Sequence, residues 1–97
     1  MFGWFNTQAA TAFGQELATY FIEKLPPAAE LNESKRASKT QYVLDKVAAR
    51  VAAFKREQAP NMFQKARLAN TVRWRMADAG YDKDYVETVV AWLVNRL

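Results

Sequence analysis

Residues that end helices divide this chain into four segments. Pro26 and Pro27 make the first break, Pro60 the second and Gly80 the third. Proline lacks the backbone N–H that a helix needs, and glycine readily takes the left-handed conformation that closes many helices. Within every segment apolar residues recur every three or four positions, and none alternates in the way that indicates a strand. The 97 residues therefore predict one all-α domain: a small antiparallel bundle of four helices, or of three long helices and a short one.

The first two predicted helices differ in how well their limits are marked. One should run from residue 6 or 7 to residue 25, where the proline pair stops it. The second should end near Gln58, but its start is open, because the polar residues 28–37 suit either a loop or an early extension of the helix. Ser38 with Gln41 is a candidate capping box. The apolar stripe of this helix is the clearest in the chain: Leu44, Val47, Ala48, Val51 and Phe54.

The last two predicted helices have strong end signals. Asn61 can cap the third helix while Gln64 reaches back to it, and Gly80 stands where a left-handed residue closes such a helix. Asp82 can cap the fourth helix. The third helix carries two apolar faces, so we expect it to use them for contact with two neighbouring helices. The main face is Leu68, Ala69, Val72, Met76 and Ala79, and the second is Phe63, Ala66, Trp74 and Ala77.

The chain contains neither cysteine nor histidine. These absences exclude disulfides, thiolate nucleophiles and Cys-ligated metals, and they remove the commonest general base and transition-metal ligand. The carboxylates are scattered, and the sequence has no glycine-rich phosphate loop and no nucleophile motif. We therefore predict that the chain is not an enzyme and has no catalytic residues, no cofactor and no metal.

Basic side chains concentrate in the middle of the chain. Residues 35–75 carry eleven Lys and Arg against Asp45 and Glu57, within a formal net charge of +4. Such a segment could follow a nucleic-acid backbone while an aromatic ring stacks on a base, or it could be a solvated face whose long side chains cover apolar surface. We favour the solvated face. If the second helix starts early enough, Lys35, Lys39, Lys46 and Arg50 project within about 60° of one another, and Tyr42 lies close by. These five residues are the candidate contacts for an anion or nucleic acid.

Residues 72–90 have the outline of a helix-turn-helix, with a glycine at the turn. A recognition helix presents its first turn to the major groove. Here that turn would bring Asp82, Asp84 and Glu87 towards phosphates and acceptor-rich base edges. We therefore expect a packed pair of helices and not a DNA-reading motif.

Aromatic side chains exceed what so small a core should hold. Those left at the surface are typical of protein interfaces. Helices that bind at a membrane surface usually carry Lys and Arg on their polar face. The first predicted helix carries Glu16 and Glu23 there and has no cation before Lys24, so we do not expect the aromatic start of the chain to bind a membrane. The candidate protein interface is Phe2, Trp4, Phe5, Phe63, Trp74, Tyr85 and Trp92.

These features together favour a small non-enzymatic helical protein that acts by protein–protein interaction. Its role would be that of an adaptor, regulator or inhibitor, with a homodimer as one form of the interaction. Sequence-tolerant nucleic-acid binding through the basic stripe of the second helix is the alternative. The sequence shows neither the charged start of a targeting segment nor an apolar run long enough to span a bilayer. We therefore expect a soluble cytoplasmic protein.

Overall fold

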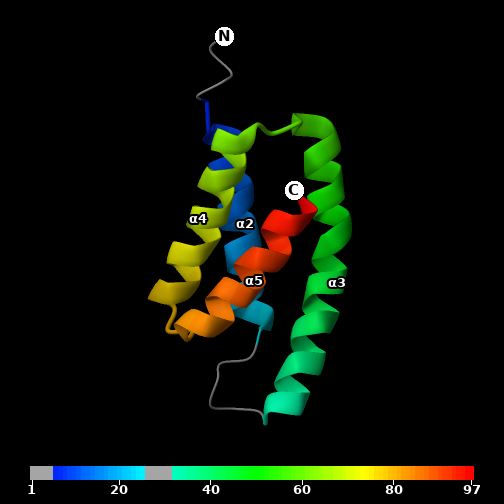
Figure 1. The fold of residues 1–97 in the computed structure, drawn as a ribbon, viewed down its shortest axis with the longest axis vertical. Coiled ribbons are helices and arrows are strands. Elements are labelled where there is room, and N and C mark those ends of the chain that lie inside the picture. The colour runs from blue at the N-terminus through cyan, green and yellow to red at the C-terminus, as the bar shows by residue number, and fades with distance from the viewer. Residues whose placement is uncertain (1–5, 26–31) are drawn as a thin grey trace.

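The computed structural model describes residues 6–25 and 32–97, and this part of the chain forms four helices and no strand. The predicted all-α, four-helix fold is confirmed. The predicted interface residues Phe2, Trp4 and Phe5 lie outside the described residues. Figure 1 shows the helices: α2 (Gln8–Lys24), α3 (Glu33–Gln58), α4 (Met62–Asp78) and α5 (Lys83–Arg96).

The predicted capping box at the start of α4 is present. Gln64 N–H donates to Asn61 Oδ1 at 2.8 Å, and Asn61 N–H donates to Gln64 Oε1 at 2.9 Å. Each side chain thus satisfies a backbone N–H that the helix cannot use internally. At the start of α5, Asp82 caps as predicted, because its Oδ2 accepts from Tyr85 N–H at 3.1 Å.

The turn between α4 and α5 closes on Gly80, as predicted. Its φ of +96° lies in the region that favours glycine. Gly80 N–H donates to Ala77 O at 3.0 Å, and Tyr81 N–H donates to Met76 O at 3.2 Å. This pair of bonds is a Schellman motif, which satisfies the last carbonyls of α4.

The predicted capping box of α3 at Ser38 is wrong. Asn32 caps the helix instead, since its Oδ1 accepts from Lys35 N–H at 2.8 Å. Ser38 and Gln41 lie inside the helix, where Gln41 donates to Asp45 at 2.8 Å. Of the segment whose state was left open, residues 33–37 extend the helix and 28–31 lie outside the described residues. The earlier start places Glu33 in the first turn, where the helix dipole favours a carboxylate.

Consecutive helices run in opposite directions, so that α2 and α4 point the same way (Figure 1). Near their starts, Gln64 Nε2 donates to Asn6 O at 2.8 Å. Towards their ends, Arg75 donates to Thr19 Oγ1 at 3.3 Å. These contacts show that α2 and α4 lie side by side in parallel register over most of their length.

Gly14 makes the close approach of α2 and α4 possible. A Cβ added there would lie 3.0 Å from Leu68 O and 3.0 Å from Thr71 Cβ. Ala10 and Ala18, one turn to either side, are also buried. The small side chains on this side of α2 therefore let the backbone of α4 come near.

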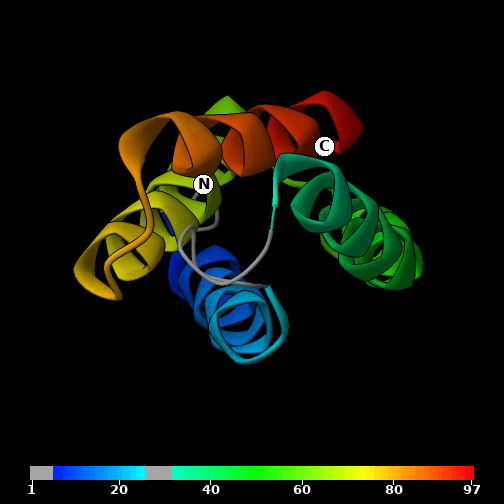
Figure 2. The same ribbon diagram turned by 90° about the horizontal axis from the view of Figure 1, so that it is seen from below.

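The other two helices complete the core. Figure 2 shows α5 lying across α3 and α4 on one side of the molecule, with α2 on the other side. No helix among the described residues has the length and apolar character needed to cross a membrane. The apolar side chains below 2% exposure include Leu17, Phe21, Val47, Val51, Leu68, Val72, Met76, Val89 and Leu93.

Candidate interaction surfaces

The second apolar face predicted for α4 points to solvent. Met62, Phe63 and Trp74 are 84%, 53% and 54% exposed, respectively. As expected, α4 contacts two helices, α2 and α5. It does so through Leu68, Val72 and other buried residues of the main face, so the expectation that the second face serves one of these contacts is wrong. We call the exposed surface the α4 apolar face, and its members are Met62, Phe63, Ala66, Trp74 and Ala77.

The α4 apolar face is hollowed between its two aromatic side chains. Phe63 and Trp74 stand about 16 Å apart along the helix, which is three turns. A depression of about 460 Å³ lies between them. Arg67 at its edge forms no ion pair with a described residue. The lining is Met62, Phe63, Ala66, Arg67, Asn70 and Trp74.

The predicted anion-contact residues all lie exposed on α3. Tyr42 is 61% exposed, and Lys46 Nζ stands 5.2 Å from the centroid of its ring. Arg50 lies over the ring of Tyr20 at 5.0 Å. No ion pair among the described residues includes a member of this set, which extends about 22 Å along the helix. We call it the α3 basic stripe: Lys35, Lys39, Tyr42, Lys46 and Arg50.

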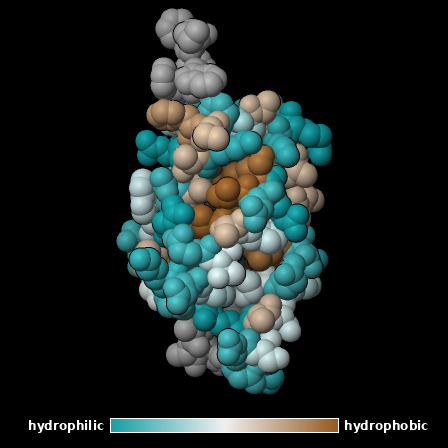
Figure 3. All heavy atoms as spheres, in the orientation of Figure 1, coloured by the Kyte–Doolittle hydropathy of each residue, from teal (hydrophilic) through white to brown (hydrophobic). Residues whose placement is uncertain are grey.

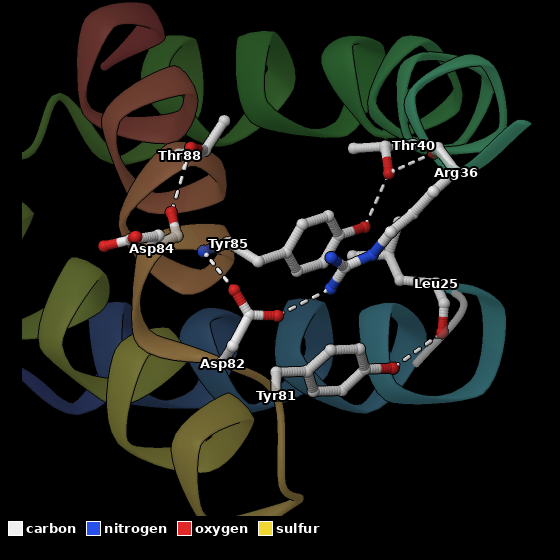
Figure 4. A network of polar contacts seen from close by, with 8 residues as sticks. All are labelled: Leu25, Arg36, Thr40, Tyr81, Asp82, Asp84, Tyr85 and Thr88. Carbon is white, nitrogen blue, oxygen red and sulfur yellow. Dashed lines mark hydrogen bonds and ion pairs between the residues drawn. The ribbon is translucent and has the colours of Figure 1, made fainter. Parts of the chain in front are cut away.

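Tyr85, a predicted interface residue, is half-buried in a polar network that joins α3 to α5 (Figure 4). The guanidinium of Arg36 lies 3.7 Å from the centre of the Tyr85 ring and donates to Asp82 Oδ1 at 2.9 Å. The Tyr85 hydroxyl shares a hydrogen bond of 2.6 Å with Thr40 Oγ1. Beside it, Tyr81 donates to the carbonyl oxygen of Leu25 at 2.6 Å. The network therefore holds the ends of α2, α3 and α5 together.

Trp92, also predicted at an interface, packs partly buried against the core. Its indole Nε1 is buried and has no hydrogen-bond partner among residues 6–25 and 32–97. Arg96, one turn later, lies over the indole at 4.6 Å. Tyr85 and Trp92 thus bury much of their apolar surface inside the protein, whereas about half of the side-chain surface of Phe63 and of Trp74 is exposed. Sequence reasoning missed Arg36, whose partners Asp82 and Tyr85 lie more than forty residues away.

Hydrogen bonds shift the titration of two carboxyl groups. The Arg36 guanidinium holds the pKa of Asp82 below its ordinary value of 3.8, and the backbone N–H of Tyr85 adds to the effect. The Arg73 side chain lowers the pKa of Glu87 below 4.5 through bonds of 2.7 and 3.2 Å. Burial raises the pKa of Tyr85 above 10.0. Both carboxyl groups therefore bind protons more weakly in the folded chain than in the unfolded chain.

Acid should weaken the fold through Asp82 and Glu87. Because their folded pKa values are lowered, their contribution to stability is present above their ordinary values, 3.8 and 4.5, and is lost as pH falls through the folded values. We expect urea unfolding midpoints to drop from about pH 4.5 downwards. The double variant Asp82→Asn, Glu87→Gln should show a shallower drop, since asparagine still caps α5. An acid slope equal to that of the parent chain would contradict this role.

Three acidic side chains that could together hold a metal ion do not occur among residues 6–25 and 32–97. Comparison with known protein families, with curated proteins and with solved structures finds no match for this chain. The surfaces of the described helices are therefore the features that bear on its function.

Proposed function

We propose that this chain acts by protein–protein interaction and pairs with a second copy of itself through the α4 apolar face. The observation that supports the proposal is the pair of aromatic side chains, Phe63 and Trp74, about half exposed on one side of one helix. Large aromatic side chains with an apolar surround are enriched at the centres of interfaces.

The α4 apolar face is self-complementary, which is why we choose a second copy as its occupant. If two α4 helices pair antiparallel about a two-fold axis midway between Leu68 and Ala69, Phe63 of one copy lies opposite Trp74 of the other. The same axis sets Arg67 opposite Asn70 of the second copy, so that a guanidinium meets an amide. Such an arrangement repeats each contact twice and closes the assembly at two copies.

Sedimentation equilibrium tests the pairing. Over about 5 μM to 1 mM the parent chain should shift from the mass of one copy to that of two. Replacing Trp74 with alanine removes the largest exposed side chain of the face, so the dissociation constant should rise about ten-fold or more. Tyr42→Ala, which truncates an exposed aromatic residue on α3, is the matched control and should pair as the parent does. A single-copy mass at every concentration, or an equal loss in both variants, would refute the proposal.

Nucleic-acid binding is the second candidate, and the observation that favours it is that no described residue forms an ion pair with a member of the α3 basic stripe. Single-stranded nucleic acid suits it best, because Tyr42 is exposed between cations and can stack on a base. Four phosphate contacts would give a slope of about −3 for the logarithm of affinity against the logarithm of salt concentration.

A salt series with a fluorescent oligonucleotide checks this candidate. The triple variant Lys39→Glu, Lys46→Glu, Arg50→Glu should lose binding at low salt. A second triple variant, Lys24→Glu, Lys65→Glu, Lys83→Glu, has the same net charge and should keep it. Equal losses in the two variants would point to net charge alone and would remove the stripe from consideration.

A further inference from the structure

A groove of about 720 Å³ runs between the C-terminal half of α3 and the end of α5. It shares no residue with the α4 apolar face or the α3 basic stripe. Figure 3 shows hydrophobic residues gathered in the middle of the face on which α5 lies, within a more hydrophilic surround. The groove is lined by Ala48, Val51, Ala52, Lys55 and Arg56 from α3 and by Asn95 and Arg96 from α5.

The floor of the groove is apolar and is formed by small side chains. Ala48 and Ala52 are one helical turn apart, so a stretch of α3 offers no side chain larger than a methyl group on this side. Val51 packs beneath them and is 1% exposed. Small side chains of this kind let the backbone of another helix approach closely.

The rims of the groove are cationic on both sides. Lys55 and Arg56 stand on the α3 side and Arg96 on the α5 side. None of the three forms an ion pair with a described residue, and no acidic side chain is part of the lining. A ligand that fills the groove must therefore be apolar in its middle and negatively charged along both edges.

We infer that this groove binds an acidic amphipathic helix of a partner protein. The apolar stripe of that helix would lie on Ala48 and Ala52, with Asp or Glu side chains facing Lys55 and Arg96. The α3 lining spans nine residues, about 12 Å, which matches a little over two turns of a docked helix. A nucleic acid fits less well, because no aromatic side chain lines the groove to stack on a base.

The test uses the full chain and a labelled synthetic helix as the probe. The peptide, of about eighteen residues, carries leucines on one face with glutamates on both flanks. A control peptide has the same composition in an order that scatters the leucines around the helix. Fluorescence anisotropy should show binding of the first peptide with a dissociation constant of about 10–100 μM and little binding of the second. Equal binding of the two would overturn the inference.

Variants of the chain locate the binding. Lys55→Glu with Arg96→Glu should weaken peptide binding about ten-fold or more. Lys39→Glu with Lys46→Glu makes the same charge change on the outer side of α3 and should leave it unchanged. Ala52→Leu fills the floor without altering charge and should also weaken binding. Circular dichroism confirms that each variant is folded. Equal losses from both charge pairs, or no effect of Ala52→Leu, would overturn the inference.

Two further measurements separate this groove from the other surfaces. Trp74→Ala should leave peptide binding intact, so that a failure of self-association does not count against the groove. The groove variant Lys55→Glu, Arg96→Glu should still pair with itself and still bind an oligonucleotide to the parent extent. If it instead loses self-association or oligonucleotide binding while the peptide never binds, the occupant is a second copy or a nucleic acid and the inference is wrong.

Discussion

Replacing Gly14 with leucine should lower the free energy of unfolding by about 3 kcal/mol. A Cβ there would already lie 3.0 Å from a backbone oxygen of α4, and backbone can move only if the whole helix moves. Gly14→Ala should cost less, because the gain of about 1 kcal/mol in helix propensity offsets part of the overpacking. Urea denaturation of the parent chain, Gly14→Leu and Gly14→Ala measures the three free energies of unfolding. The protein concentration should be too low for self-association.

A matched control lies on the same helix. Ala12 is exposed on α2, so Ala12→Leu adds a comparable side chain at the surface of the same helix. It should change stability by no more than about 0.5 kcal/mol. If Gly14→Leu were equally mild, α2 and α4 could not be as close as the structure places them.

Truncation of Phe21 to alanine should cost about 3–5 kcal/mol. Its side chain is wholly buried, as is that of Leu17 one turn earlier, so the change leaves a cavity in the centre of the core. For a domain of this size the loss approaches the whole stability of the fold. Unfolding in urea with a stabilising osmolyte keeps the variant measurable.

The control for Phe21 is an aromatic truncation at the surface. Tyr42→Ala removes a ring that is 61% exposed and should cost no more than about 1 kcal/mol. A loss below about 1.5 kcal/mol at Phe21 would mean that the surrounding side chains collapse into the space, contrary to a packed core.

The sequence predicts the parts of this fold that depend on neighbours within a few residues. The caps at Asn61 and Asp82 and the turn at Gly80 form from groups at most six residues apart, so their signals are complete in the local sequence. The start of α3 could not be placed from the sequence, because the polar residues 28–37 suit either a loop or a helix. Asn32, and not Ser38, caps the helix in the structure, so residues 33–37 belong to α3.

Surfaces that depend on the relative placement of helices could not be predicted. The second apolar face of α4 has the same spacing whether a helix covers it or solvent does. The groove beside Ala52 exists only because the end of α5 lies beside the C-terminal half of α3, and Arg36 meets Tyr85 across a separation of nearly fifty residues. One signal was available: Gly14 interrupts an otherwise good helix and is flanked by alanines four residues to either side, which indicates a close crossing.

The parallel pairing of α2 with α4 has a kinetic consequence. Helical proteins usually fold fast because their contacts are local along the chain. Here the contacts between Asn6 and Gln64 and between Thr19 and Arg75 close a loop that contains the whole of α3. Closing that loop lowers the entropy of the chain, and this loss precedes the favourable contacts of the tightest helix crossing in the described chain. Refolding should therefore be slower than for a bundle in which each helix packs mainly on the next one.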